Sequence, residues 1–448
     1  MTASLGTHPL RTLTTALDPA TLSELGITGA TSFLSKNSDV DPLTWLRRGE
    51  GLLGFGEIAS FSGSGPDRFS DAEQWWKELL ASATVEDSVR IPGTGAMAFG
   101  SFAFSKTSRY ESLLIVPALV VGFAGGTVWL TQLTIDGSSP TRESALELLR
   151  GLAPTPSAPE GSTSDAPSEG SVSSGALTEK QWKDTVAAGV EAIVRGGLEK
   201  VVLARDVLAT LQEPVQRVSI LQRLVTLYDE CWTYAVRGLV GATPEILIKV
   251  DGATAQARVL AGTLDREDEP AGSTGFAATV LGGSAKQRQE HDFAVRSLTR
   301  QLAPFATDLS FPAEPFILEL PNVWHLASDV TAQLASSNGH LPTSLALVEA
   351  LHPTAAVCGT PREDAGELIL ELEQMDRGPY AGPVGWLDGA GNGEWGIALR
   401  GAVLEDAHHV RLYAGAGIVQ ASDPAAELAE TWAKFRPMLQ ALNLAHRP

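Results

Sequence analysis

Cysteine is scarce in this chain, and Cys231 and Cys358 are the only two among 448 residues. The pair has no metal-ligand spacing, which favours a reducing compartment. Long hydrophobic runs are also missing, since no stretch of about 18 apolar residues occurs. The first residues lack the basic start and apolar core of a signal peptide. These absences predict a protein of the cytoplasm that does not enter a membrane.

Positively charged residues are also few compared with negatively charged ones. The 33 Lys and Arg residues face 53 Asp and Glu residues, which gives a formal net charge of −20. Such a balance argues against nucleic acid and against anionic membrane surfaces as partners. It also means that an anionic substrate must be met by a local concentration of positive charge. The chain is long enough to bury one large core or two ordinary ones.

A segment rich in Pro, Ser, Gly and Ala divides the chain. We expect residues 153–175 to be a flexible loop between an N-terminal part, 1–152, and a C-terminal region, 176–448, that carries the catalytic site. Strand-like runs on both sides follow one another as in hairpins, with few alternations of strand and helix. The pattern predicts an α+β fold with large antiparallel sheets in a layered sandwich with outer helices, not a Rossmann fold. The predicted strands are residues 51–58, 96–104, 113–123, 127–133, 200–209, 232–237, 246–250, 253–260, 384–387, 394–404 and 409–414.

A helix is predicted to begin after Ser284, at a capping-box pattern, and to run to about Leu302. Glu290 lies on the same apolar stripe as Ala294, so its carboxylate should point inward. An inward carboxylate must be paired, protonated or bound to a metal, because an isolated buried charge is too costly. A structural ion pair with Arg288 or Lys286 is the alternative.

A second helix should begin at Asp423, a good N-cap, with Pro424 as its first residue. Glu427, Glu430 and Lys434 then project from one face. Two carboxylates and an ammonium group could hold a hard cation and an anionic ligand, although a solvated surface ion pair is the alternative. Two helices that each present carboxylates favour a shared divalent ion.

The strand predicted at residues 394–404 carries an arginine that could bind a carboxylate. Trp395, Ile397 and Leu399 alternate onto one face, which should be core. Arg400 lies on the opposite face between small residues, where there is room for a bound group. The glycine-rich segment 412–418 lets backbone N–H groups approach an oxyanion, although it is weak as a phosphate motif.

These motifs stand in a characteristic order. They include Gly241-Ala-Thr-Pro-Glu245 and Arg377-Gly-Pro-Tyr380. The segments that match densely are 198–205, 241–245, 260–263, 286–291, 322–326, 352–359, 377–386, 398–400 and 413–434, and residues 64–69 and 98–104 match more thinly. Taken together, they resemble the chorismate-utilising enzymes (the family that includes anthranilate synthase component I), and within them the isochorismate synthases. Thr243, Gln287 and Cys358 depart from the usual residues, but none stands at a proton-transfer or metal position.

The resemblance implies a fold and a reaction. The fold is that of the chorismate-utilising enzymes, and the reaction adds water at C2 of chorismate while the 4-hydroxyl leaves. Lys200 matches the family base and Glu245 the family acid. A lysine acts as a base only if its surroundings favour the neutral form, and an acid glutamate must be kept protonated by an apolar setting.

The same resemblance implies a Mg²⁺ cofactor and a set of substrate contacts. Glu290 and Glu430 match the metal ligands, with Glu427 alongside them. Arg400 and Tyr380 match the residues that hold the enolpyruvyl carboxylate, with backbone N–H groups of Gly415 and Gly417. The remaining matched positions are Lys434, Gly262 and Thr263 around the ring carboxylate, and His325 against the ring.

Single positions distinguish the sibling reactions. Anthranilate synthases have glutamine where Lys200 stands, aminodeoxychorismate synthases have lysine where Ala261 stands, and salicylate synthases tend to have threonine where Ala356 stands. The resemblance therefore implies an isomerase that releases isochorismate, for menaquinone or siderophore biosynthesis, without a glutamine amidotransferase subunit. We expect a monomer, because the sequence contains no coiled-coil or obvious interface pattern. A salicylate synthase and a non-catalytic chorismate-binding protein remain the alternatives.

Overall fold

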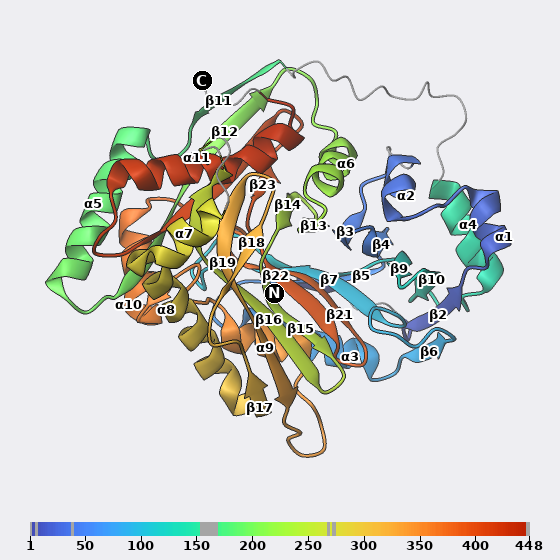
Figure 1. Ribbon diagram of the computed structural model, residues 1–448. Helices are drawn as coiled ribbons and strands as arrows, with labels where there is room; N and C mark the ends of the chain where they lie inside the picture. Colours follow the sequence, from blue (N-terminus) through green and yellow to red (C-terminus); the bar gives the residue numbers. More distant parts are fainter. Residues whose placement is uncertain are drawn as a thin grey trace.

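The computed structural model describes residues 2–4, 8–36, 40–152, 169–266, 269–270 and 275–444, the side chains of residues 2–4, 35, 36, 286 and 290 excepted. Most of the described strands belong to two large sheets (Figure 1). The first, with 11 described strands, runs in the order β1 (Thr2–Ser4), β5 (Ala59–Gly63), β8 (Ser112–Val116), β7 (Met97–Ser101), β21 (Pro383–Asp388), β22 (Gly393–Ile397), β15 (Ile246–Asp251), β16 (Thr254–Asp265), β19 (Val323–Leu334) and β17 (Ala306–Ser310), with β18 (Phe316–Glu319) also on β19.

The second sheet has 13 strands in the described part of the chain. Its order is β11 (Gly170–Ser174), β12 (Lys200–Leu211), β24 (His409–Ile418), β23 (Gly401–Leu404), β14 (Leu239–Thr243), β13 (Trp232–Val236), β3 (Leu43–Arg47), β4 (Glu50–Phe55), β9 (Leu119–Ala124), β10 (Thr127–Thr134), β2 (Arg11–Ala16) and β6 (Thr84–Asp87), with β20 (Gly359–Thr360) also on β12. Its pairs are antiparallel except for β2 with β6. The expected large antiparallel sheets are confirmed.

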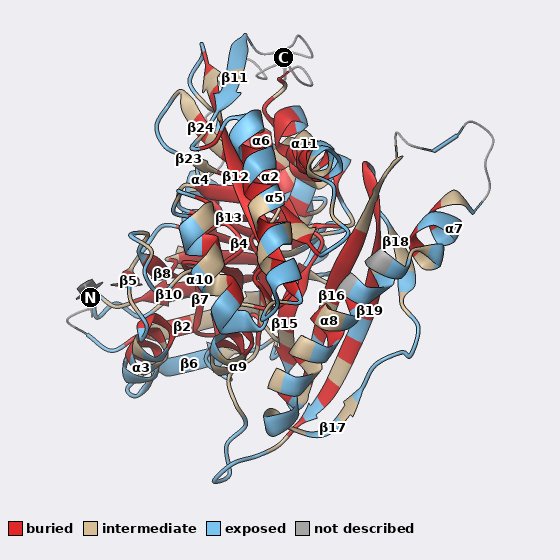
Figure 2. Cartoon of the chain, turned by 90° about the vertical axis from the view of Figure 1, so that its left-hand side faces the viewer, coloured by how far each residue is buried: buried red, intermediate tan, exposed pale blue. Residues whose placement is uncertain are grey.

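Helices cover the outer faces of the sheets. They are α1 (Pro19–Leu25), α2 (Ala30–Lys36), α3 (Arg68–Leu80), α4 (Arg142–Leu152), α5 (Glu179–Arg195), α6 (Arg217–Leu227), α7 (Phe276–Gly283), α8 (Ala285–Leu302), α9 (Ser344–Leu351), α10 (Arg362–Leu372) and α11 (Pro424–Ala441). Helices α3, α8 and α9 pack on the first sheet, whereas α2, α4, α5, α6 and α11 pack on the second. Figure 2 shows buried strands inside and helices whose exposed faces point outward. None of the described helices has the length and apolar character needed to cross a bilayer.

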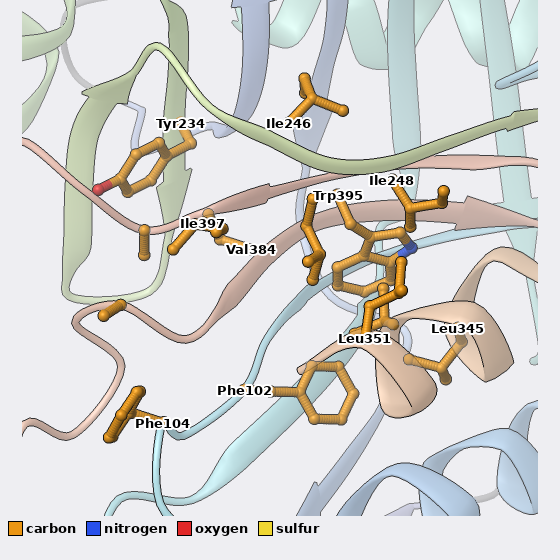
Figure 3. Close-up of a cluster of buried hydrophobic side chains, with 14 of the residues drawn as sticks. Phe102, Phe104, Tyr234, Ile246, Ile248, Leu345, Leu351, Val384, Trp395 and Ile397 are labelled. Atoms are coloured by element: carbon orange, nitrogen blue, oxygen red, sulfur yellow. The ribbon is translucent and has the colours of Figure 1, made fainter. Parts of the chain in front are cut away.

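A large hydrophobic core joins the two sheets. Phe99 of β7 lies so close to Gly54 of β4 that a Cβ on the glycine would be 2.7 Å from the phenylalanine ring. Trp395 is fully buried and packs edge-to-face on Phe102, with ring centroids 5.8 Å apart. Figure 3 shows these rings beside Leu345 and Leu351 of α9, which close the core from below the first sheet. The sheets are therefore packed on each other and not merely adjacent.

Both parts of the chain contribute to both sheets. In the first sheet, β7 from the N-terminal part pairs with β21 from the C-terminal part. In the second, β3 pairs with β13. Most of the predicted loop, residues 153–168, lies outside the described residues, but Gly170–Ser174 at its end form β11 and pair with β12.

Two predicted strands are each divided between the two sheets. Residues 113–123 form β8 in the first sheet and β9 in the second, because Pro117 has no N–H to continue a ladder. Residues 394–404 form β22 in the first sheet and β23 in the second. Between them Arg400 has a positive φ of 49°, which a regular strand does not contain. The single long strand predicted there is wrong, and the break places Arg400 between the sheets.

Candidate functional site

A cavity lies where the chain passes from one sheet to the other. The segment from Thr243 to Ile246 leads from β14 to β15, and the segment through Arg400 leads from β22 to β23. A bulge in β16 between Leu260 and Thr263 opens a third side. The cavity is narrow, with about 60 Å³ of space for the centres of water molecules. Its walls include all of the predicted substrate-binding residues, namely Gly262, Thr263, His325, Ala356, Tyr380, Arg400, Gly415, Gly417 and Lys434.

Glu245 brings a carboxyl group into the cavity wall. Its side chain lies where the chain crosses between sheets and is only 4% exposed. Burial raises the pKa of Glu245 from its usual 4.5 to about 8, against the opposing effects of the Leu260 backbone N–H and the charges of Lys200, Lys434 and Arg400. Glu245 is therefore protonated at neutral pH and can donate a proton into the cavity.

Lys200 is the first residue of β12 and is fully buried. Val201 and Leu203, on one face of this strand, contact α5 near Gly189. Because side chains alternate along a strand, Lys200 shares the opposite face with Val202, which lines the cavity. Lys200 lies beside the wall and close enough to Glu245 for their charges to interact. The structure thus brings the predicted base and the predicted acid to one site.

His325 of β19 is held in one tautomer by its neighbours. Arg400 Nη2 donates to Nε2 of the ring at 3.0 Å, so Nε2 accepts and the proton resides on Nδ1. Nδ1 then donates to the carbonyl oxygen of Gly262 at 3.2 Å. Burial, with the charges of Arg400 and Lys434, lowers the pKa of His325 well below its usual value. The ring is neutral and fixes the direction of the Arg400 guanidinium.

Tyr380 forms another side of the cavity. Its ring stacks on Tyr413 with centroids 5.2 Å apart, and burial raises the pKa of Tyr380 to about 12. The phenol therefore keeps its proton and can donate to an anion. Gly415 lies beside this hydroxyl, and a Cβ at that glycine would be 3.1 Å from the oxygen. A side chain at position 415 would therefore press against the phenol, whereas the prediction for this glycine concerned the approach of its backbone N–H to an oxyanion.

Helix α11 begins as predicted. Asp423 accepts hydrogen bonds from the N–H groups of Ala425 and Ala426, and Pro424 is the first helical residue. Glu427 in the first turn is 2% exposed. One turn later Glu430 accepts from Lys434, whose ammonium group also donates to the carbonyl oxygen of Gly415. The helix thus presents two carboxylates beside a cavity residue.

The described residues only partly test the predicted metal ligands. Helix α8 spans the predicted range, and its Ser284 N-cap accepts from Gln287 N–H. The side chain of Glu290 lies outside the described residues. Among the side chains that are described, no group of three or more His, Cys, Asp or Glu residues is close enough to hold a metal ion. The carboxylates of Glu427 and Glu430 nevertheless suit a hard cation, which prefers oxygen ligands.

One charged residue of the cavity wall was not predicted from the sequence. Arg377 lines the cavity and is 3% exposed. It belongs to a recognised motif, but its chemistry depends on partners distant in the chain. Its guanidinium binds Glu373 and two backbone carbonyl groups. No pattern in the sequence indicates this role, because Arg377 follows other polar residues, among them Glu373, Gln374 and Asp376.

Comparison with known proteins identifies the family. A family profile described as "Chorismate binding enzyme" matches residues 31–443. Isochorismate synthase DhbC of Bacillus subtilis is 38% identical over 278 residues, which cover 60% of this chain and 69% of that protein. The salicylate biosynthesis isochorismate synthase of Pseudomonas aeruginosa is 32% identical over 413 residues, covering 90% of this chain and 84% of that protein.

Solved structures agree on the fold. The menaquinone-specific isochorismate synthase MenF of Escherichia coli superimposes with a TM-score of 0.75 at 23% identity, covering 98% of this chain and 95% of that one. The likeness confirms the predicted α+β fold. With the family profile matching nearly the whole length, the chain belongs to the chorismate binding enzymes.

Proposed function

We propose that this chain is an isochorismate synthase, an isomerase that converts chorismate to isochorismate by adding water at C2 and releasing the 4-hydroxyl. The observation that carries the proposal is the buried, protonated Glu245 in the wall of a cavity that Lys200 adjoins. The reaction needs a proton donor and a proton acceptor, and these two residues supply both. The relatives named as isochorismate synthases support the same activity.

In this proposal Lys200 accepts the proton of the attacking water, and Glu245 protonates the departing 4-hydroxyl, which leaves as water. Glu245 is suited to the second role because a carboxyl group with a pKa of about 8 is still protonated at neutral pH. Glu245 is almost completely buried, so bulk water does not compete for the proton.

Chorismate carries two carboxylates, and the cavity offers cationic and N–H donors for both. Arg400, held in place by His325, and the hydroxyl of Tyr380 would receive the enolpyruvyl carboxylate, with backbone N–H groups of Gly415 and Gly417. Lys434, Gly262 and Thr263 would surround the ring carboxylate. This local positive charge meets a dianion in a chain whose net charge is −20.

We propose Mg²⁺ as the cofactor, held by Glu290 and Glu430 with Glu427 alongside. When bound, it would neutralise the ring carboxylate and fix its position. Lys434 donates a hydrogen bond to Glu430 and also lines the cavity, so it links the carboxylates of Glu427 and Glu430 to the substrate pocket. Release of isochorismate to menaquinone or siderophore biosynthesis, by a monomer without an amidotransferase subunit, belongs to the same proposal.

Incubation of the purified protein with chorismate and Mg²⁺, followed by chromatography, tests the function. A new isochorismate peak is expected, lost with EDTA and restored by added Mg²⁺. Salicylate with pyruvate would instead identify a salicylate synthase, and unchanged chorismate would contradict the proposal. Activity that survives exhaustive chelation would remove the metal role from Glu290 and Glu430.

A further inference from the structure

Strand β12 has an unusual edge. Along one side it pairs with β24 without interruption from Val201 to Thr210. Along its other side it pairs with β20 at Lys200 and Val201, and with β11 from Val207 onward. Between these two described partners no strand pairs with the edge. On this edge, the carbonyl oxygen of Val202 and the N–H group of Ala204 form hydrogen bonds with side chains instead.

A buried ion pair occupies this gap. Arg377 Nη2 donates to the carbonyl oxygen of Val202 at 2.7 Å, and Glu373 Oε1 accepts from the N–H of Ala204 at 2.7 Å. The two side chains bind each other through two hydrogen bonds and are only 3% and 1% exposed. Together they provide the donor and acceptor that a neighbouring strand would have offered.

The same guanidinium reaches a second wall of the cavity. Arg377 Nη1 donates to the carbonyl oxygen of Val357 at 2.8 Å, next to Ala356. Three residues later, Tyr380 N–H donates to the Arg377 carbonyl oxygen at 3.0 Å. The side chain of Arg377 therefore connects β12, which begins with Lys200, to the segment that carries Ala356. Its backbone belongs to the turn that carries Tyr380.

We propose that the Glu373–Arg377 pair positions the catalytic groups, by setting the separation between Lys200 on β12 and the ring-facing wall at Ala356 and Val357. The inference rests on the proposed isochorismate synthase function. Neither side chain is assigned a chemical step. A buried ion pair is weak evidence of a role in stability, since apolar residues often replace one without loss, but its planar geometry fixes backbone positions. Small misplacements of reacting groups cost about 10²-fold in rate.

The Arg377→Lys variant tests the inference. It keeps the charge that Glu373 needs, but an ammonium group does not reproduce the fork that binds two carbonyl groups and a carboxylate. We expect kcat per folded molecule to fall by about 10²-fold while KM changes little. The matched control is Arg195→Lys on α5, which makes the same substitution in an exposed Glu–Arg pair of the same spacing, with both side chains 69% exposed. The control should leave kcat unchanged.

Unchanged kcat per folded molecule in Arg377→Lys would overturn the inference, even if the variant melts at a lower temperature. If that variant does not fold, Glu373→Gln decides in the same assay, because its amide oxygen can still accept from Ala204 N–H. A normal kcat there would equally overturn the positioning role.

Hydrogen exchange separates this inference from the proposed function, since it needs no substrate. In folded Arg377→Lys, peptides covering residues 200–206 and 354–358 should exchange faster than in the unmodified protein, while α5 and α9 should not. Unaltered exchange in those two segments would overturn the inference. Failure of the unmodified protein to convert chorismate would instead contradict the proposed function.

Discussion

Burial of Glu245 makes both activity and stability depend on pH in a defined direction. Its pKa is raised from 4.5 to about 8, so the acid form needed for proton donation is present below pH 8 and is lost above it. We expect kcat to fall as pH rises through about 8. Between pH 4.5 and 8, Glu245 holds a proton in the folded state that it has released in the unfolded state. The contribution of Glu245 to the free energy of unfolding therefore declines as pH rises through this range.

Chemical denaturation at pH 5 and pH 8 measures the stability effect. The Glu245→Gln variant, which stays neutral at every pH, should lack this part of the decline and should lose at least about 10²-fold in kcat. A kcat that stays constant up to pH 10 would show that Glu245 is not the acid.

Removal of the base should separate binding from turnover. We expect Lys200→Ala to fold and to bind chorismate with Mg²⁺, because the carboxylate contacts come from other residues, but to lose turnover. Calorimetric binding and product chromatography measure the two properties. Lys180→Ala, at an exposed position of α5, is the control. Near wild-type turnover in a clean preparation of Lys200→Ala would refute the assignment.

Product choice should depend on Ala356 in the cavity wall. The Ala356→Thr variant places a hydroxyl there and should gain measurable salicylate and pyruvate, while the unmodified chain releases mainly isochorismate at pH 7.5. About 1.4 kcal/mol in relative barriers alters partitioning tenfold. Ala356→Val has similar bulk without the hydroxyl, and the same salicylate from that variant would exclude the hydroxyl as the cause.

At the residue scale, the sequence predicted the binding residues of the cavity wall, but not Arg377 and Glu373, whose hydrogen bonds hold that wall in place. Arg400, Tyr380 and the two glycines of β24 were found because they belong to contiguous motifs. Arg377 and Glu373 were missed because their partners, Val202 and Ala204, are more than 160 residues away in the chain. A side chain that bonds a distant backbone leaves no periodic pattern in the sequence.

At the scale of single elements, the start of α11 supports the proposed metal site. The Asp423→Ala variant removes two hydrogen bonds to backbone N–H groups and should cost about 1 kcal/mol of stability. We also expect weaker Mg²⁺ binding by calorimetry, since Glu427 lies in the first turn. Asp18→Ala removes the N-cap of α1 at a distance from the cavity and should lower stability without affecting Mg²⁺. Equal Mg²⁺ affinity in both variants would argue against Glu427.

Element boundaries show where periodicity fails. Residues 394–404 alternate as a single strand would, yet the chain leaves one sheet at Ile397 and enters the other at Gly401. The alternation of apolar residues does not reveal this crossing, because adjacent residues on opposite faces are buried in both strands, such as Trp395 and Gly396 in β22 and Gly401 and Ala402 in β23. The crossing is visible only in the backbone, where Arg400 has a positive φ.

At the scale of the whole molecule, the two parts of the chain should not fold separately. Both sheets combine strands from either side of residues 153–168, so a fragment of residues 176–448 would expose the edges of β21 and β13 and lose the core residues that the N-terminal strands supply. We expect an NMR spectrum with poor dispersion for this fragment, and a single unfolding transition for the full chain. A well-dispersed fragment spectrum would mean that the C-terminal region is an independent domain.

The two segments that lead from one sheet to the other, between β14 and β15 and between β22 and β23, also restrict where residues can be inserted or deleted. A residue inserted or deleted between β22 and β23 would shift the pairing of β23 by one position and turn its inward side chains outward. The same holds between β14 and β15, where Glu245 stands. Length variation is tolerated at surface turns such as the one at Ser337 and His340. We therefore expect the length of the chain to be constrained at these two crossings, since an insertion or deletion there would displace Glu245 or Arg400 from the cavity wall.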